Sequence, residues 1–267
     1  MAWKIAESLP STTMPATTKA RPSQLQRLFA ARPIERIEAN RVLYRGDSES
    51  GFLFEIARGC VRHFTMCRDG RRSIVAFSFE GDYCGDPLER ANIFSAEAIT
   101  QLEVRRISGA QLRAAVANLP ELEGELLALA CRELESAQTH CVVLRSNSAL
   151  AKVASFLVSS ESRLASGDAP QRVIQLPMSR LDVADFLGLT IESVSRAFTQ
   201  LKMCGYISVT GRNQIVIGEI SALRKLADAY PLEALVPHSS RAHNMIELKP
   251  ARVGRLSTEQ SDPRTTH

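Results

Sequence analysis

Apolar and polar positions change their period along the chain, and this change predicts two regions of different architecture. Residues 1–22 are rich in Ser, Thr, Pro and Ala without an apolar period, so we expect a flexible lead-in. From Leu43 onward, short strand-like runs are separated by Gly-containing turns, which is typical of an antiparallel barrel or roll. The runs are Leu43–Arg45, Phe52–Ala57, Val61–Met66 and Ser73–Phe79.

The region 176–201 instead predicts two short helices joined at a glycine. Ser179 can cap the first helix, and Gly188 can end it in the left-handed conformation. Thr190 can cap the second helix. Each helix has one apolar face, formed by Val183, Ala184 and Leu187 in the first and by Ile191, Val194, Phe198 and Leu201 in the second.

The segments on either side of the two helices complete a larger unit. Val173–Leu176 is a short strand that ends at Pro177. Gly205 closes the second helix, and Tyr206–Thr210 with Gln214–Ile217 predict a hairpin. Strand, helix, turn, helix and hairpin together predict a winged helix-turn-helix.

The second helix also has a polar stripe, formed by Glu192, Ser195, Arg196 and Thr199. Arg can donate two hydrogen bonds to guanine O6 and N7, Glu can accept from cytosine N4, and Ser can bond a nearby base or phosphate. An ordinary solvated face with a Glu192–Arg196 salt bridge is the alternative. The flanking strand and hairpin favour a DNA-binding face.

A second stripe precedes this unit, beyond Pro120. Apolar and small residues recur at alternating steps of three and four, as in a helix that packs along a seam. Just over two heptads leave packing on the chain's own first half as the alternative. We favour a homodimer, because a helix-turn-helix usually reads two half-sites through a two-fold dimer. The seam consists of Leu127, Ala130, Leu134, Ala137, Cys141 and Leu144.

Composition adds limits to this picture. A chain of 267 residues that is 45% hydrophobic can bury more than one core. Lys and Arg total 33 against 29 acidic residues, so phosphate attraction is modest and base readout carries a larger share of binding. No apolar run approaches the ~20 residues of a spanning helix, and the N-terminus lacks a hydrophobic signal core. We therefore expect a cytoplasmic protein without membrane contact.

The 6 cysteines are scattered without a C-x-x-C pair, which argues against a zinc or iron–sulfur site and favours free, mostly buried thiols. His63 and Cys67 could share a strand face, but a pair is not a metal site. We expect neither a metal nor a cofactor. Cys204 follows the second helix and is either a redox-sensitive position or a small buried residue that closes the helix.

Residues 173–217 resemble the DNA-binding domain of Crp/Fnr regulators, and Glu192-Ser-Val-Ser195-Arg196 resembles the E-x-x-S-R signature of the Fnr and FixK branch. The first half resembles the cyclic-nucleotide-binding-like β-roll of that family, in the turn 81–85 and the run 95–99. No cysteine precedes Cys60, so the chain resembles the FixK type, which lacks an N-terminal cysteine cluster.

The resemblance implies a role for each reading residue on a TTGAT-type half-site. It assigns Arg196 to guanine, Glu192 to the cytosine side of a pair and Ser195 to an adjacent thymine. Where cyclic-nucleotide-binding members carry an Arg for the phosphate, this chain has Phe94, so cAMP binding is not expected. We expect DNA-backbone contacts from Ser179, Arg180, Thr190, Thr199 and Arg212.

The sequence thus predicts an α+β chain that is not an enzyme. It has a flexible segment 1–22, an antiparallel β-roll 23–117, a long dimerisation helix 118–147, a winged helix-turn-helix 148–229 and a disordered tail 230–267. The resemblance implies a homodimeric transcription regulator that binds a palindrome, contacts RNA polymerase and controls low-oxygen respiration or nitrogen metabolism. Two alternatives remain: a receptor for an effector in the β-roll, and a β-roll enzyme, which needs a histidine cluster where His63 stands alone.

Overall fold

The first half of the chain forms an antiparallel β-roll in the computed structural model, which describes residues 22–48, 51–88, 92–164, 172–211 and 213–227. Within these residues the roll consists of two four-stranded sheets, with strand orders β1-β8-β3-β6 and β2-β7-β4-β5. The strands are β1 (Glu35–Ile37), β2 (Val42–Tyr44), β3 (Phe52–Arg58), β4 (Cys60–Met66), β5 (Arg72–Phe79), β6 (Tyr83–Cys84), β7 (Ser95–Ala98) and β8 (Leu102–Ser108).

The four strands predicted from the sequence, β2 to β5, lie within one residue of their expected ends. The sequence pattern did not predict β1, β6, β7 or β8. Strand β8 buries Leu102, Val104 and Ile107, but the step of three between the last two breaks the alternation that would identify a strand in the sequence. The strand β6 is only two residues long, too short for any periodic signal.

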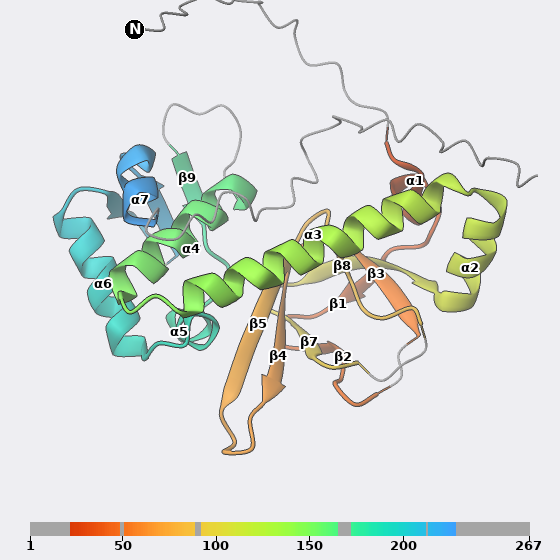
Figure 1. Ribbon diagram of the computed structural model, residues 1–267, viewed down its shortest axis with the longest axis horizontal. Helices are drawn as coiled ribbons and strands as arrows, with labels where there is room; N and C mark the ends of the chain where they lie inside the picture. Colours follow the sequence, from red (N-terminus) through yellow and green to blue (C-terminus); the bar gives the residue numbers. More distant parts are fainter. Residues whose placement is uncertain (1–21, 49–50, 89–91, 165–171, 212, 228–267) are drawn as a thin grey trace, which may run out of the picture.

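Three helices cover the β-roll: α1 (Gln24–Ala30), α2 (Gly109–Asn118) and α3 (Glu121–Leu144). Figure 1 shows α3 running along the roll, with α1 and α2 near one of its ends and the second half of the chain at the other. The start of α1 is tied to α3, because the backbone N–H groups of Gln24 and Leu25 donate to the Glu125 carboxylate at 2.9 and 2.8 Å. The sequence pattern predicted neither α1 nor α2.

The second half is a winged helix-turn-helix, as predicted (Figure 1). Its β-sheet has the strand order β10-β11-β9. A longer helix precedes the sheet, and a short helix closes the unit. The elements are α4 (Ala149–Leu164), β9 (Arg172–Gln175), α5 (Arg180–Leu187), α6 (Ile191–Met203), β10 (Ile207–Val209), β11 (Gln214–Ile217) and α7 (Ile220–Ala227).

One apolar core continues from the β-roll into the second half of the chain. Phe77 on β5 packs against Phe156 on α4 and Phe186 on α5, with ring centroids 6.4 and 5.1 Å apart. Aromatic pairs at this spacing add to the stabilisation from buried area. The DNA-binding unit therefore packs directly on the β-roll of its own chain.

Several expectations concern residues outside the described ranges. The flexible lead-in falls almost entirely on residues 1–21, and the disordered tail on residues 228–267. The domain boundaries stay predictions. Among the described residues, no helix is long and apolar enough to cross a membrane.

Candidate nucleic-acid interface

Helix α5, the first of the two helix-turn-helix helices, is closed at both ends by the predicted residues. The Ser179 hydroxyl accepts from the backbone N–H of Asp182 at 3.1 Å, and the Asp182 carboxylate accepts from the Ser179 backbone N–H at 3.0 Å. This reciprocal pair is a capping box. At the other end Gly188 takes the left-handed conformation, with φ 60° and ψ 40°. Both expectations are confirmed.

Helix α6 is the candidate recognition helix, and it too begins at the predicted cap. The Thr190 side chain accepts from the backbone N–H of Ser193 at 3.2 Å. Gly205 follows the helix with φ 74°, and the backbone N–H of Tyr206 donates to the carbonyl of Leu201 at 3.0 Å. A left-handed glycine with a bond back into the last turn is a common helix ending.

The polar stripe of α6 lies on its exposed side. Val194, Phe198 and Leu201 are buried beneath it, as expected, and Ala197 joins them. Ile191, which the sequence pattern assigned to the apolar face, is 40% exposed instead, because it lies in the first turn at the edge of the core. The exposed stripe contains Glu192, Ser195, Arg196 and Thr199.

The charged side chains of the polar stripe do not form an ion pair with each other in the described chain. Among the described residues no salt bridge joins Glu192 to Arg196; Arg196 Nη2 donates instead to Ser193 Oγ at 3.4 Å. Hydrogen bonding from its own backbone N–H, then Thr190 and the charge of Arg196, lower the pKa of Glu192, so its carboxylate is an acceptor at neutral pH. Ser193, beside this stripe, was not singled out from the sequence.

The predicted backbone-contacting residues have different surroundings. Thr199 is exposed and donates to the Ser195 carbonyl at 3.0 Å. The Arg180 guanidinium lies over the Phe198 ring, 3.3 Å from its centroid, and desolvation lowers the pKa of Arg180. The Ser179 hydroxyl donates to Asp182 at 2.7 Å. Arg212 lies outside the described residues.

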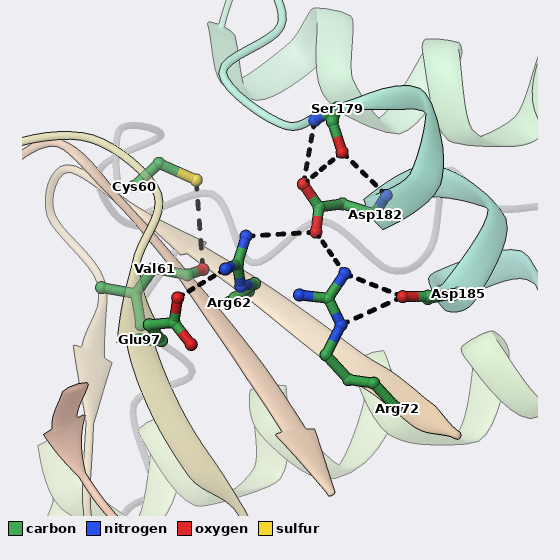
Figure 2. Close-up of polar contacts among 8 residues, drawn as sticks. All are labelled: Cys60, Val61, Arg62, Arg72, Glu97, Ser179, Asp182 and Asp185. Atoms are coloured by element: carbon green, nitrogen blue, oxygen red, sulfur yellow. Dashed lines mark hydrogen bonds and ion pairs between the residues drawn. The ribbon is translucent and has the colours of Figure 1, made fainter. Parts of the chain in front are cut away.

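Helix α5 is joined to the β-roll by five charged side chains, here called the junction cluster: Arg62, Arg72, Glu97, Asp182 and Asp185 (Figure 2). Arg62 Nη1 lies 3.2 Å from Asp182 Oδ1, and Arg72 Nη2 lies 2.8 Å from the same oxygen. Arg72 also donates to Asp185 Oδ2 from Nε and Nη2, at 3.0 and 2.8 Å. Sequence reasoning missed this cluster, because its partners are about a hundred residues apart and share no local pattern.

The other end of α5 contacts helices α3 and α4. The His140 ring stacks on Phe186, with centroids 4.1 Å apart, and the buried Lys152 Nζ donates to the Leu187 carbonyl at 3.2 Å. Desolvation, followed by the charge of Lys152, lowers the pKa of His140 to about 4. His140 is therefore a neutral stacking partner at neutral pH.

The seam stripe of α3 is exposed in the single chain. Leu122 and Val143 are the buried residues of this helix. All six seam residues are exposed, including Leu127 at 66% and Leu134 at 58%. Four of these residues, Ala130, Ala137, Cys141 and Leu144, also line the cavity that α3 shares with the β-roll, so this part of the stripe faces the chain's own first half. Leu127 and Leu134 do not line that cavity and are open to a partner.

The histidine and cysteine positions do not form a metal site. His63 is buried, with Nδ1 3.2 Å from the Tyr44 hydroxyl and Nε2 2.8 Å from Ser78 Oγ, and desolvation lowers its pKa to about 4. Cys67 is exposed, and a register shift after His63 breaks the strand alternation between them. No group of three or more potential ligands occurs in the part of the chain that the structure describes.

The expectation of mostly buried thiols is wrong. Cys60 and Cys84 are buried, but the other four cysteines are exposed. Cys131 and Cys141 are exposed residues of α3, and Cys204 is the exposed C-cap of α6. The Cys204 thiol, at the end of α6, is therefore accessible to solvent.

The fold and the exposed stripe define the class: a winged helix-turn-helix DNA-binding regulator with a cyclic-nucleotide-binding-like β-roll. Residues 151–226 match the family model of the Crp-like helix-turn-helix domain. The nitrogen fixation regulation protein FixK of Azorhizobium caulinodans is 35% identical over 212 residues, 79% of this chain and 85% of that protein. FixK of Bradyrhizobium diazoefficiens is 40% identical over 157 residues, 59% of this chain and just under two thirds, 66%, of that protein.

A solved structure agrees with these relatives. The structure of FixK2 from Bradyrhizobium japonicum superposes with a TM-score of 0.69 at 32% identity, covering 73% of this chain and 96% of that chain. The chain therefore belongs to the Crp/Fnr family of transcription regulators, in its FixK-like branch, as the resemblance implied.

Proposed function

We propose that this regulator binds, as a homodimer, a palindrome of two TTGAT-type half-sites, each read by one α6 helix. In this proposal Arg196 donates to guanine, Glu192 accepts from the cytosine side of a pair, and Ser195 contacts an adjacent thymine. The observation that carries it is the polar stripe itself, which is exposed and has no internal Glu192–Arg196 ion pair in the described chain. The contacts that position the helix on phosphates come from Ser179, Arg180, Thr190, Thr199 and Arg212.

The dimer is proposed from the apolar stripe of α3. Exposed apolar side chains at seam spacing gain free energy when a second helix covers them. A two-fold dimer also places two recognition helices about one DNA turn apart, roughly 34 Å, which is what a palindrome requires. A second copy of this chain is therefore the partner that satisfies both the seam and the DNA site.

The biological process is proposed from the relatives. The FixK relatives are nitrogen fixation regulation proteins, which supports a role in nitrogen metabolism. The family resemblance implies control of low-oxygen respiration as the alternative. We extend the proposal to contact between the DNA-bound dimer and RNA polymerase, which the family resemblance implies.

Binding to designed duplexes tests the proposal. Fluorescence anisotropy would compare a palindrome of two TTGAT-type half-sites, a duplex with one half-site and a duplex of scrambled sequence. We expect the palindrome to bind at least about 1,000-fold more tightly than the scrambled duplex at physiological salt, the usual margin of a specific regulator. Equal affinity for all three duplexes would contradict the proposal.

An effector-binding role is the second candidate, and a cavity bounded by the β-roll, α3 and α5 favours it. Its volume is about 920 Å³, within the usual range for ligand sites. Its described lining includes Phe94 and the carboxyl groups of Asp86, Glu133 and Asp185, but neither Lys nor Arg. Such a lining suits an uncharged, largely apolar effector better than a phosphate. Calorimetry with cAMP should therefore show no binding at millimolar concentration, and micromolar affinity would contradict this account of the cavity.

A further inference from the structure

The junction cluster places charges where the two halves of the chain meet, and Asp182 is at its centre. Asp182 is 4% exposed and belongs to the capping box that starts α5. The same carboxylate receives Arg62 from β4 and Arg72 from β5 (Figure 2). One side chain therefore fixes both the start of α5 and its position on the β-roll.

The charges of the cluster are shared rather than paired one to one. Arg62 bridges Glu97 on β7 and Asp182, while Arg72 bridges Asp182 and Asp185. The five side chains are between 5% and 23% exposed, so water screens them weakly. Removing one arginine leaves a poorly solvated carboxylate without its partner, which costs far more than losing a surface ion pair.

The cluster is poorly explained as a source of stability alone. Arg62 Nε is buried without a hydrogen-bond partner in the described chain, so the network is incompletely satisfied. Buried ion pairs often contribute less stability than well-packed apolar residues of the same volume. An ion-pair network does fix the relative orientation of the segments it joins, because a guanidinium binds carboxylates in one planar, forked geometry.

The cluster acts on α5 and leaves the reading stripe free. Asp182 and Asp185 are three residues apart and lie on the same side of α5, while Arg196 and its neighbours on α6 are exposed. The cluster therefore does not cover the reading stripe in the single chain, and any effect it has on DNA binding must come through the orientation of α5.

Helices α5 and α6 pack tightly on each other, which connects the cluster to the reading stripe. They share a buried core, and the Arg180 guanidinium of α5 lies on the Phe198 ring of α6. A rotation of α5 on the β-roll would therefore tilt α6 by a similar amount.

We propose that Arg62 and Arg72 are positioning residues for DNA recognition: they set the orientation of α5 on the β-roll and thereby the direction in which α6 presents its reading stripe. This inference rests on the proposed reading of DNA by α6. In a dimer this positioning sets the distance and angle between the two recognition helices. Loss of the positioning should therefore weaken binding to a palindrome more than binding to a single half-site.

The substitution Arg72→Met tests the proposal, because it removes the charge and keeps an unbranched side chain. The fold should survive, since Phe186 and Leu187 still contact His140 and Lys152 at the other end of α5. We expect affinity for the palindrome to fall by about 10-fold or more, affinity for a single half-site to change by less than about threefold, and the preferred half-site spacing to broaden. The dimer and the melting temperature serve as controls for folding.

Two further variants separate positioning from a general loss of structure. The exchange Arg72→Asp with Asp185→Arg restores an opposite-charge pair between positions 72 and 185 but sets a second carboxylate near Asp182, which keeps Arg62 as its partner. The exchange should therefore recover part of the palindrome affinity. Arg71→Met is the matched control, because Arg71 is 84% exposed and its ion pair, among the residues that the structure describes, is with Asp69 in its own turn. It should leave both affinities unchanged.

Each outcome decides something different. If wild type does not prefer the palindrome over a scrambled duplex, the proposed function fails. If wild type has that preference and Arg72→Met retains or strengthens it, only the positioning role is overturned. Equal losses on the palindrome and on the single half-site, without rescue by the exchange, would also overturn it and would assign the cluster to folding alone.

Discussion

Helices α3 and α6 each have an exposed stripe, but the two stripes differ in chemistry. On α3 the stripe is apolar and includes Leu127 and Leu134, which are more than half exposed. On α6 the stripe is polar and charged, and no salt bridge joins Glu192 to Arg196 in the described chain. Exposed leucines gain free energy from any apolar cover, whereas charged groups remain well solvated until a partner offers matching hydrogen bonds. The first stripe therefore suits a protein partner, and the second suits DNA.

The two helices are also supported differently. Behind the α6 stripe lie Val194, Phe198 and Leu201, and α5 beside it is fixed at both ends. Helix α3 buries only Leu122 and Val143 in the single chain. The reading surface is thus prepared in advance, while the seam needs a second chain to complete it. Breaking either stripe should produce a distinct defect.

The largest effect is expected from Leu134→Asp. The substitution would place one carboxylate from each chain in the proposed seam, so the dimer should become a monomer in sedimentation experiments. Affinity for the palindrome should fall by about 100-fold or more, because the two half-sites would no longer be bound together. Ala128→Asp, one residue outside the seam stripe, is the control and should remain a dimer. A Leu134→Asp dimer with normal affinity would show that the seam is elsewhere.

Arg196→Ala should have the next largest effect, about 1–3 kcal/mol on the specific site, a typical contribution of a bidentate guanine contact. Binding to random DNA should change little. Lys202→Ala removes a charge near the end of α6 and should weaken specific and random binding equally and slightly. Titrations of the three proteins against both duplexes provide the measurement. Equal losses for Arg196→Ala on both duplexes would make Arg196 a phosphate contact.

Glu192→Ala should relax specificity without abolishing binding. Removing the carboxylate removes an acceptor for cytosine but also a negative charge near phosphates, and these effects oppose each other. We expect discrimination at one base pair to fall by roughly 10-fold, measured with a set of single-base-pair variants of the half-site. Unchanged discrimination at every position would contradict the assigned role.

The smallest effect is expected from oxidation of Cys204. Its exposed thiol ends α6, so an oxidised, charged adduct could repel phosphate or tilt the helix. Peroxide treatment should weaken DNA binding by a few-fold at most in wild type and less in Cys204→Ala. Because Cys131 and Cys141 are also exposed, the dimer must be checked after oxidation. Equal weakening of both proteins, or none, would exclude Cys204 as the switch.

The features predicted from the sequence are those with a local cause. Strands β2 to β5, the caps Ser179, Gly188 and Thr190 and the two stripes all follow from side-chain periodicity or from one residue's conformational preference. The junction cluster and the stacking of His140 on Phe186 depend on contacts between distant segments. No local pattern specifies such contacts, so they became visible only in the folded chain. The exposure of Ile191 has the same origin, because the edge of a core is a property of the fold.

Selection of bound sequences from a random duplex pool tests the central claim most directly, since it reports half-site, symmetry and spacing together. The account predicts enrichment of two inverted TTGAT-type half-sites at one fixed spacing. Enrichment of a single unpaired half-site, of an unrelated sequence, or of no sequence at all would contradict it.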